Sequence, residues 1–413
     1  MIPFVMHSLG DKSYGLWIFI ASFFDLSKIF DLGFSPSVQR YLSRAIGTED
    51  HNEANIVVNT SLFMLSVIGT IALVFVMGAA FLVPLFVKDI TVAALFNWIT
   101  LFANSLAYLA SFIAAKKVAS YLIFSGRFII FSRIKALFQY GAHTFINKIA
   151  DNLRFGIDNF VITIFLELSS VTLFSIASRL ITGFMDFISN GINVLMPVFS
   201  QYESNGDYQS IREKFILTSK ISGYAAVLIG GILLIFGKMF IIRWMGPEYK
   251  AAYHLLAVLV IPITLALMQC PSVEALYGVS KQKFYTISNV IEGLANLVLS
   301  IILVKKYGLM GVALGTAIPM FVIKLFVQPV YTCRVIKLSL SYYYIHLMGM
   351  SMVKSTIILG ILWLAVRSFI MPNYLHLALQ ITLCLILFTL VIFFAGLKST
   401  ERQYVKRILI PNL

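Results

Sequence analysis

The chain has 413 residues, of which 59% are hydrophobic and only 12% are charged, and its mean hydropathy is +0.89. A soluble globular domain carries roughly 25% charged residues, so this composition excludes one and predicts an all-α, polytopic membrane protein. The formal charge of +14 comes from 32 Lys and Arg against 18 Asp and Glu. In a membrane protein an excess of Lys and Arg usually reflects the orientation of the chain across the membrane, so it does not indicate binding to nucleic acid.

Apolar stretches of about 20 residues, the length that a bilayer core requires, recur along the whole chain. The segment 121–131 is too short and too interrupted to cross, and we expect it to lie at the membrane surface. We predict eleven spans, at 14–33, 57–83, 93–115, 137–166, 171–198, 216–242, 251–277, 284–304, 308–332, 348–371 and 374–396.

Lys and Arg are distributed unequally between the two sets of loops. Eighteen lie on one side of the predicted membrane and eight on the other. The richer side faces the cytoplasm, which predicts an external N-terminus and a cytoplasmic C-terminus. The six remaining cations fall inside spans: Lys28, Lys148, Arg154, Arg179, Lys324 and Lys354.

The span at 137–166 carries a polar stripe. At about 100° per residue, five of its polar side chains fall within an arc of roughly 80°, with Lys148 about 60° outside it. A charged side chain facing lipid costs about 2.5 kcal/mol or more, so this side must face protein or a water-filled cavity. The stripe consists of His143, Asn147, Asp151, Arg154 and Asp158.

Two further spans repeat this pattern. Three helices with one polar side each predict a hydrated chamber, since intramembrane ionisable groups usually mark a transport path. A structural interpretation stays open, because residues three or four apart on one helix can neutralise one another. The second stripe holds Ser175, Arg179, Asp186, Asn190 and Asn193, and the third holds Tyr285, Asn289, Glu292, Asn296 and Ser300.

No pattern indicates catalysis, a metal or a cofactor. The three Cys form no paired motif and the six His have no ligand spacing. The sequence has no nucleotide-binding loop, nucleophile elbow or zinc-protease motif. We therefore predict a protein that is not an enzyme and that uses neither a metal nor a cofactor.

A weak internal repeat predicts two similar helical lobes. The tripeptide Ile20-Ala21-Ser22 recurs as Ile176-Ala177-Ser178, and each copy precedes a polar loop and a Thr-Ser pair. The offset between the copies is 156 to 158 residues. Paired lobes with a site between them are typical of secondary transporters.

Several stretches resemble the polysaccharide-unit (O-antigen and exopolysaccharide) flippases of the multidrug, oligosaccharidyl-lipid and polysaccharide exporter superfamily. The most specific is a basic turn, an Asn-bearing helix and a Tyr-Gly-Leu-x-Gly-x-Ala reversal, within ALYGVSKQKFYTISNVIEGLANLVLSIILVKKYGLMGVALGTAI from Ala275. The others are Tyr14-Gly15-Leu16-Trp17, Asp31-Leu32-Gly33-Phe34 with Arg40 and Arg44, and FGIDNFVITIFL from Phe155.

The resemblance implies fourteen helices, in two six-helix lobes plus two more. Compared with that pattern, the chain lacks the first helix and one hairpin, which leaves the eleven spans predicted above. We expect an incomplete N-terminal lobe over 1–131, a complete six-helix lobe over 132–340, and two extra helices with a basic tail over 341–413.

The resemblance also implies that the chain flips an undecaprenyl-diphosphate-linked oligosaccharide across the bacterial inner membrane, for O-antigen or another surface polysaccharide. Expected partners are this substrate, membrane lipids, a polysaccharide polymerase and a chain-length regulator. An anion in a low-dielectric chamber needs compensating charge, and the candidates for substrate binding are Lys28, Asn147, Lys148, Arg154, Arg179, Asn190 and Asn193. Buried carboxylates suit proton or sodium coupling, and the candidates are Asp151, Asp158, Asp186 and Glu292.

Two other functions remain open at this point. A cation-coupled multidrug exporter of the same superfamily would favour a chamber lined by acids and aromatic rings. A non-transporting membrane scaffold in a polysaccharide assembly complex would fit the reduced number of helices.

Overall fold

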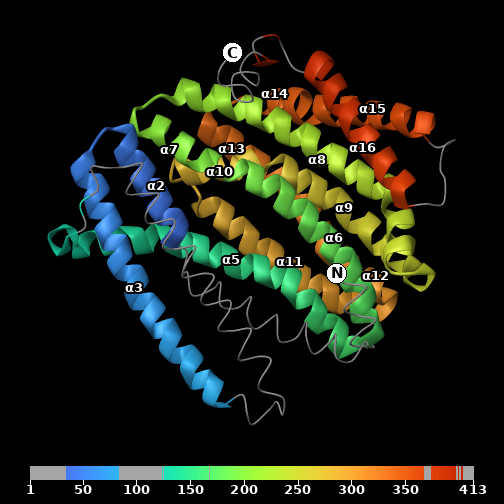
Figure 1. Ribbon diagram of the computed structural model, residues 1–413, viewed down its shortest axis with the longest axis horizontal. Coiled ribbons are helices and arrows are strands. Elements are labelled where there is room, and N and C mark those ends of the chain that lie inside the picture. The colour runs from blue at the N-terminus through green and yellow to red at the C-terminus, as the bar shows by residue number, and fades with distance from the viewer. Residues whose placement is uncertain are drawn as a thin grey trace. The chain divides into compact units, whose positions relative to one another are not determined.

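A computed structural model of the protein describes residues 34–82, 123, 125–166, 168–366, 374–396, 399 and 401–402. These residues form two compact units, one up to Phe145 and the other from Ile146, so the boundary falls within helix α5 (Phe131–Phe165). We call them the N-terminal and C-terminal units. The part of the chain that the structure describes is helical and contains no strand, as predicted (Figure 1).

In the N-terminal unit, asparagines of one helix hold a non-helical segment. Asn55 accepts a hydrogen bond from the Ile123 N–H at 2.6 Å, and Asn59 accepts one from the Ser125 N–H at 2.8 Å. Side-chain amides and carbonyls thus satisfy backbone groups that no secondary structure pairs. The unit contains α2 (Phe34–Gly47), α3 (His51–Leu82), η3 (Gly126–Phe128) and the start of α5.

The C-terminal unit is a helical bundle. Its elements are α6 (Leu168–Ile192), α7 (Leu195–Ser204), α8 (Tyr208–Trp244), η4 (Pro247–Ala251), α9 (Ala252–Met268), α10 (Cys270–Gly278), α11 (Lys283–Tyr307), α12 (Leu309–Val322), η5 (Ile323–Val327), α13 (Gln328–Ile336), α14 (Leu340–Tyr342), η6 (Tyr343–Gly349), α15 (Met350–Val366), α16 (Tyr374–Val391) and η8 (Ile392–Gly396).

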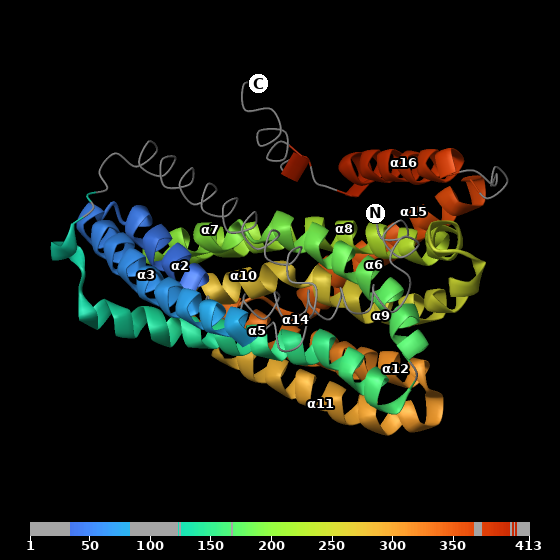
Figure 2. The ribbon, with the colours of Figure 1, turned by 60° about the horizontal axis from the view of Figure 1, so that its bottom comes forward.

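Helix α9 lies at the centre of this bundle and packs against α6, α8 and α12 (Figures 1 and 2). Its sequence, AYHLLAVLVIPITLALM, is apolar all round, which is typical of a helix that is enclosed by others. The helix continues through Pro262 and ends at Met268, two residues before the Cys270-Pro271 start of α10. A proline at the first helical turn is tolerated because its missing N–H would have no partner there.

Seven stretches of the described residues are long and apolar enough to cross a membrane. They are Ser170–Ser204, Tyr208–Trp244, Pro247–Gly278, Lys283–Tyr307, Leu309–Ile336, Leu340–Leu364 and His376–Phe394. Each coincides with one of the last seven predicted spans. The predicted spans 14–33 and 93–115 lie outside the described residues, so the total of eleven stays a prediction.

Helices α11 and α12 form a tight hairpin. Gly308 turns the chain with φ +56°, a conformation that glycine adopts without steric cost. Gly311 and Gly315 then lie on the side of α12 that faces α11, against the backbone of Leu303 and Ser300. Small residues four apart let two membrane helices approach closely, so this hairpin brings the polar side of α11 close to α12.

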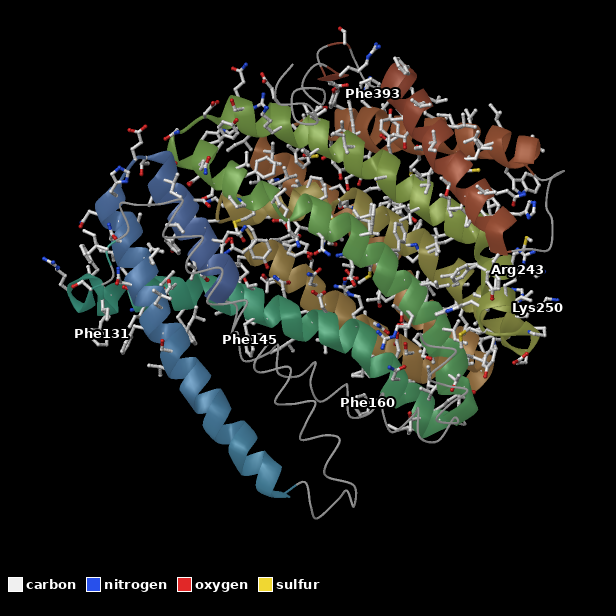
Figure 3. All side chains as sticks on the ribbon, in the orientation of Figure 1. Phe131, Phe145, Phe160, Arg243, Lys250 and Phe393 are labelled. Atoms are coloured by element: carbon white, nitrogen blue, oxygen red, sulfur yellow. The ribbon has the colours of Figure 1, made fainter. Side chains whose placement is uncertain are left out.

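Helix α8 connects the two ends of the C-terminal unit. Figure 3 shows Arg243 and Lys250 at the end where α8 finishes and η4 begins. This end belongs to the set of loops with fewer Lys and Arg, which the sequence predicts to be external. At the opposite end, Asp207 caps α8 by accepting a hydrogen bond from the Ser210 N–H at 3.0 Å, and the hydrogen bonds from Ser210 lower the pKa of its carboxyl.

Candidate functional site

Helices α5 and α11 carry two of the predicted stripes, and inside the C-terminal unit their charged residues meet. Arg154 Nε of α5 lies 3.0 Å from Glu292 Oε1 of α11, and Lys324 Nζ of η5 lies 3.3 Å from Glu292 Oε2. Glu292 is 1% exposed and Arg154 is 6% exposed. We call these three residues the ionic triad.

The opposite sides of the same helices are apolar and exposed. Phe160 of α5 is 67% exposed and lies on the outside of the unit (Figure 3). An inverted arrangement, with charge inside and hydrocarbon outside, is what a bilayer favours. On α11 the exposed apolar side consists of Ile287, Ile291, Leu294, Val298 and Ile302.

Buried amides extend the triad along α11. Asn289 Nδ2 donates to Asn147 Oδ1 at 2.9 Å, and Asn289 Oδ1 accepts from Lys324 Nζ and from Gln328 Nε2, each at 3.2 Å. Asn147 Nδ2 in turn donates to Thr286 Oγ1 at 2.9 Å. These bonds satisfy amides that would otherwise be costly at this depth, and they fix the positions of the charged groups.

A π-helical turn places Lys324 in the triad. The turn η5 interrupts the α12–α13 helix at Ile323–Val327 and releases carbonyls from the usual bonding pattern. Gln269, at the break between α9 and α10, donates to the Lys324 carbonyl, and Tyr344 donates to the Leu325 carbonyl at 2.5 Å. From the sequence, Lys324 is an intramembrane cation and a possible counter-charge for the substrate, but its pairing with Glu292 could not be predicted, because a π-helical turn has no reliable sequence signature.

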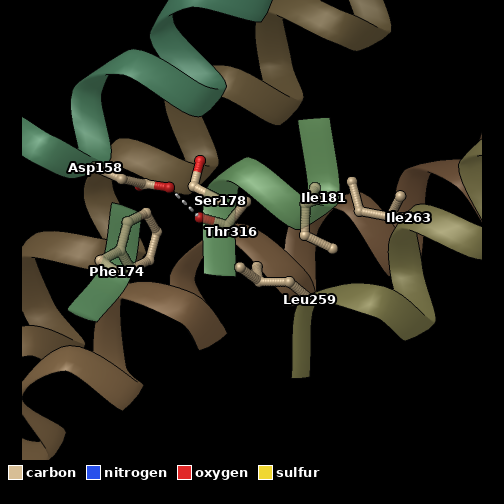
Figure 4. A pocket seen from close by; sticks show the side chains of 7 residues that line it. All are labelled: Asp158, Phe174, Ser178, Ile181, Leu259, Ile263 and Thr316. Atoms are coloured by element: carbon tan, nitrogen blue, oxygen red, sulfur yellow. Dashed lines mark hydrogen bonds between the residues drawn. The ribbon is translucent and has the colours of Figure 1, made fainter. Parts of the chain in front are cut away.

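Asp158 lies in a second, separate polar site near the end of α5. It is 1% exposed, its Oδ2 accepts a hydrogen bond from Thr316 at 2.8 Å, and its Oδ1 has no hydrogen-bond donor among the described residues (Figure 4). Beside it is a cavity of about 10 Å³, room for one water molecule. The lining comes from α5, α6, α9 and α12 and comprises Asp158, Phe174, Ser178, Ile181, Leu259, Ile263 and Thr316.

Further oxygen atoms surround Thr316. Its hydroxyl lies 3.5 Å from Asn296 Oδ1 and 3.3 Å from the Val312 carbonyl, and Asn296 Oδ1 also accepts from Ser300 at 2.8 Å. We call Asp158, Asn296, Ser300, Val312 and Thr316 the oxygen cluster. Carboxylate, carbonyl and hydroxyl oxygens are the ligands that hard cations prefer.

Asn296 connects the oxygen cluster with the turn of α5 that carries the ionic triad. Its Nδ2 donates to the Arg154 carbonyl at 2.7 Å. Asn296 and Ser300 belong to the third predicted stripe, whereas Thr316 was not predicted from the sequence. The four-residue spacing of Gly311 and Gly315 was the available signal, because it predicts that α12 approaches α11 there.

The α6 stripe does not join these buried groups. Arg179, Asp186, Asn190 and Asn193 are all exposed on the surface of the C-terminal unit. Asp151 is also exposed, at 53%, yet its Oδ1 lies 3.4 Å from Arg154 Nη2. Asp151 and Arg154 thus pair along one helix, while both the structural interpretation and the shared hydrated chamber stay predictions.

Two candidate residues cannot be placed. Lys28 and the side chain of Lys148 lie outside the described residues. Among the side chains that are described, no three His, Cys, Asp or Glu gather in a way that could hold a metal ion.

Comparisons with known proteins connect this architecture to a family. A family described as polysaccharide biosynthesis protein matches residues 72–254. A putative O-antigen transporter of Shigella flexneri is 21% identical over 392 residues, which cover 80% of this chain and 92% of the relative. The chain is thus similar to polysaccharide biosynthesis proteins and to an O-antigen transporter.

Two other relatives align with this chain over less than half of their own length. A probable low-salt glycan biosynthesis flippase of Haloferax volcanii is 23% identical over 235 residues, covering 56% of this chain and 48% of the relative. A membrane protein of Bacillus subtilis is also 23% identical, over 46% of its own length. The chain thus spans about half the length of these two relatives. The relatives whose function is named are flippases or transporters rather than enzymes. At the level of the relatives, this agrees with the expectation that the protein is not an enzyme.

Solved structures confirm the predicted fold class. A MATE protein in a bent conformation superposes with a TM-score of 0.66 at 14% identity, over 84% of this chain and 90% of that structure. The lipid II flippase MurJ, in an inward closed conformation, superposes with a TM-score of 0.55 at 14% identity, over 95% and 92%. At this identity the likeness establishes the fold alone, that of an all-helical, multi-pass membrane protein.

Proposed function

We propose that the protein flips an undecaprenyl-diphosphate-linked oligosaccharide from the inner to the outer leaflet of the bacterial cytoplasmic membrane. The family match and the named functions of the relatives support transport of a lipid-linked glycan. The observation that carries the proposal is the buried ionic triad, because ionised groups at this depth are retained where a membrane protein moves ions or polar substrates.

The substrate diphosphate would be recognised by guanidinium groups. Arginine presents a planar fork of donors that matches phosphate oxygens in pairs. Arg179 is exposed on α6, and Arg154 pairs with the exposed Asp151 on α5. We assign contact with the diphosphate to these two arginines. Two exposed amides, Asn190 of α6 and Asn193 just after it, are assigned to the sugar hydroxyls.

Coupling would use the oxygen cluster. Among the described residues no cation lies within ion-pair distance of Asp158, although it is almost fully buried. A buried carboxylate in this state needs a proton or a bound cation. The cavity beside Asp158 and the oxygens of Asn296, Thr316 and Val312 suit a proton-bearing water or a sodium ion. We therefore assign the coupling cation to Asp158, ahead of Asp151, Asp186 and Glu292.

The orientation proposed from the loop charges places the C-terminus in the cytoplasm. The flipped glycan would then be available to a polymerase and a chain-length regulator outside, which are the partners that assembly of a long surface polysaccharide requires.

The test is complementation of polymer display in cells that lack their own flippase. Arg154→Ala and Arg179→Ala should each abolish display while the protein remains at its wild-type level in the membrane. Lys250→Ala, which removes an exposed cation in η4 far from both arginines in the chain, is the matched control and should display normally. Full display by both arginine variants would overturn the site assignment.

A further inference from the structure

Glu292 has one cation on each oxygen of its carboxylate. Arg154 Nε lies 3.0 Å from Oε1, and Lys324 Nζ lies 3.3 Å from Oε2. A buried carboxylate that loses its counter-ion is strongly disfavoured. Since Glu292 is held from both sides, it can release one cation and still be paired with the other.

The two cations differ in how firmly they are fixed. Lys324 Nζ also donates to Asn289 Oδ1 at 3.2 Å and lies 5.4 Å from the centre of the Tyr285 ring. Its backbone is held by the bond from Gln269 to its carbonyl within the π-helical turn. Lys324 is therefore anchored by side chain and backbone inside the bundle.

Arg154 spans the distance from the buried triad to the surface. Its Nε faces Glu292, which is buried, and its Nη2 faces Asp151, which is largely exposed. A guanidinium has five N–H donors in a rigid fork. A diphosphate that arrives beside Asp151 can thus compete for the same donors.

We propose that Lys324 is a positioning residue: it keeps Glu292 neutralised, so that Arg154 can exchange Glu292 for the diphosphate of the substrate without leaving a buried anion unpaired. This inference rests on the function proposed above and adds a residue that does not touch the substrate. It requires Lys324 to act through Glu292, which means that its importance should vanish when Glu292 carries no charge.

The test measures binding of farnesyl diphosphate to the purified full-length protein in detergent, with farnesol as the comparator that lacks the phosphates. Lys324→Met should weaken diphosphate binding about tenfold or more, because Glu292 then retains Arg154 as its remaining counter-ion. Lys324→Arg keeps the charge and should bind like the wild type. The double variant Lys324→Met, Glu292→Gln should recover binding, since no anion remains to retain Arg154.

The outcomes separate this inference from the proposed function. A wild-type protein that binds farnesyl diphosphate no better than farnesol refutes diphosphate recognition, and with it this inference. A wild type that does bind, together with Lys324→Met of equal affinity, overturns the role of Lys324 alone. If Lys324→Met does not fold, the double variant decides, because the amide that replaces the Glu292 carboxylate needs no counter-ion. A folded double variant that fails to bind farnesyl diphosphate overturns the inference.

Discussion

Removing the charge of Glu292 should destabilise the C-terminal unit more than any single charge removal at its surface. In Glu292→Gln the shape of the side chain is kept, but Arg154 and Lys324 face a neutral amide in a site that is almost fully buried. Breaking a buried ion pair from one side costs about 3–5 kcal/mol. At roughly 2 °C per kcal/mol for a domain of about 250 residues, the melting temperature should fall by about 6 °C or more.

Thermal unfolding of the purified protein in one detergent measures this effect. Glu213→Gln is the matched control: Glu213 is exposed near the start of α8 and accepts a single hydrogen bond from Gln209, so its melting temperature should stay within about 1 °C of the wild type. A Glu292→Gln protein with the same melting temperature as the wild type would show that the charge of Glu292 contributes no net stabilisation. This result would refute the reasoning from buried charge.

Three further predictions follow from other contacts. Gly315→Ala should lower the yield of folded protein, because the added methyl group would meet the backbone of α11. The control Gly183→Ala on α6 meets no neighbouring atom and should be neutral or stabilising by about 0.4–1 kcal/mol. Equal yields of the two variants would contradict the close approach of α12 to α11. Lys220 and Glu401 form a partly buried ion pair at 2.5 Å, so Lys220→Glu should lower the melting temperature, and the swap Lys220→Glu, Glu401→Lys should restore part of it. A swap that melts no higher than the single variant would argue against the pair. Wild-type protein should gain up to about 2.7 kcal/mol of stability at a cation concentration 100 times the dissociation constant. Asp158→Asn should lose this gain in the same titration. An Asp158→Asn protein that the cation stabilises as much as the wild type would place the cation elsewhere.

The helical positions of the buried groups could be predicted from the sequence because hydrocarbon imposes a strict rule on charge. A period of 3.6 residues placed Asn147, Arg154 and Asp158 on one side of α5, and the structure buries all three. The same rule applied to α11 placed Glu292 and Asn296 on its buried side.

The same pattern on α6 has a different outcome, since Arg179 and Asp186 are exposed. Periodicity identifies the polar side of a helix but does not reveal which element, if any, covers it. That information lies in tertiary packing.

The partners of Lys324 and Thr316 could not be predicted from the sequence for a related reason. The direction of Lys324 depends on the π-helical turn at Ile323–Val327, and a shift of one residue rotates a helical side chain by about 100°. Thr316 approaches Asp158 only because Gly311 and Gly315 bring α12 against α11. Both depend on contacts between segments that are distant in the chain.

Flipping itself is the most direct test of the account. The protein, reconstituted in sealed vesicles with a fluorescent prenyl-diphosphate oligosaccharide, should transfer the sugar to the opposite leaflet, with transfer lost in Arg179→Ala, made independent of the cation gradient in Asp158→Asn, and unchanged in Lys250→Ala. Vesicles in which the wild type moves the sugar no faster than protein-free vesicles would contradict the account.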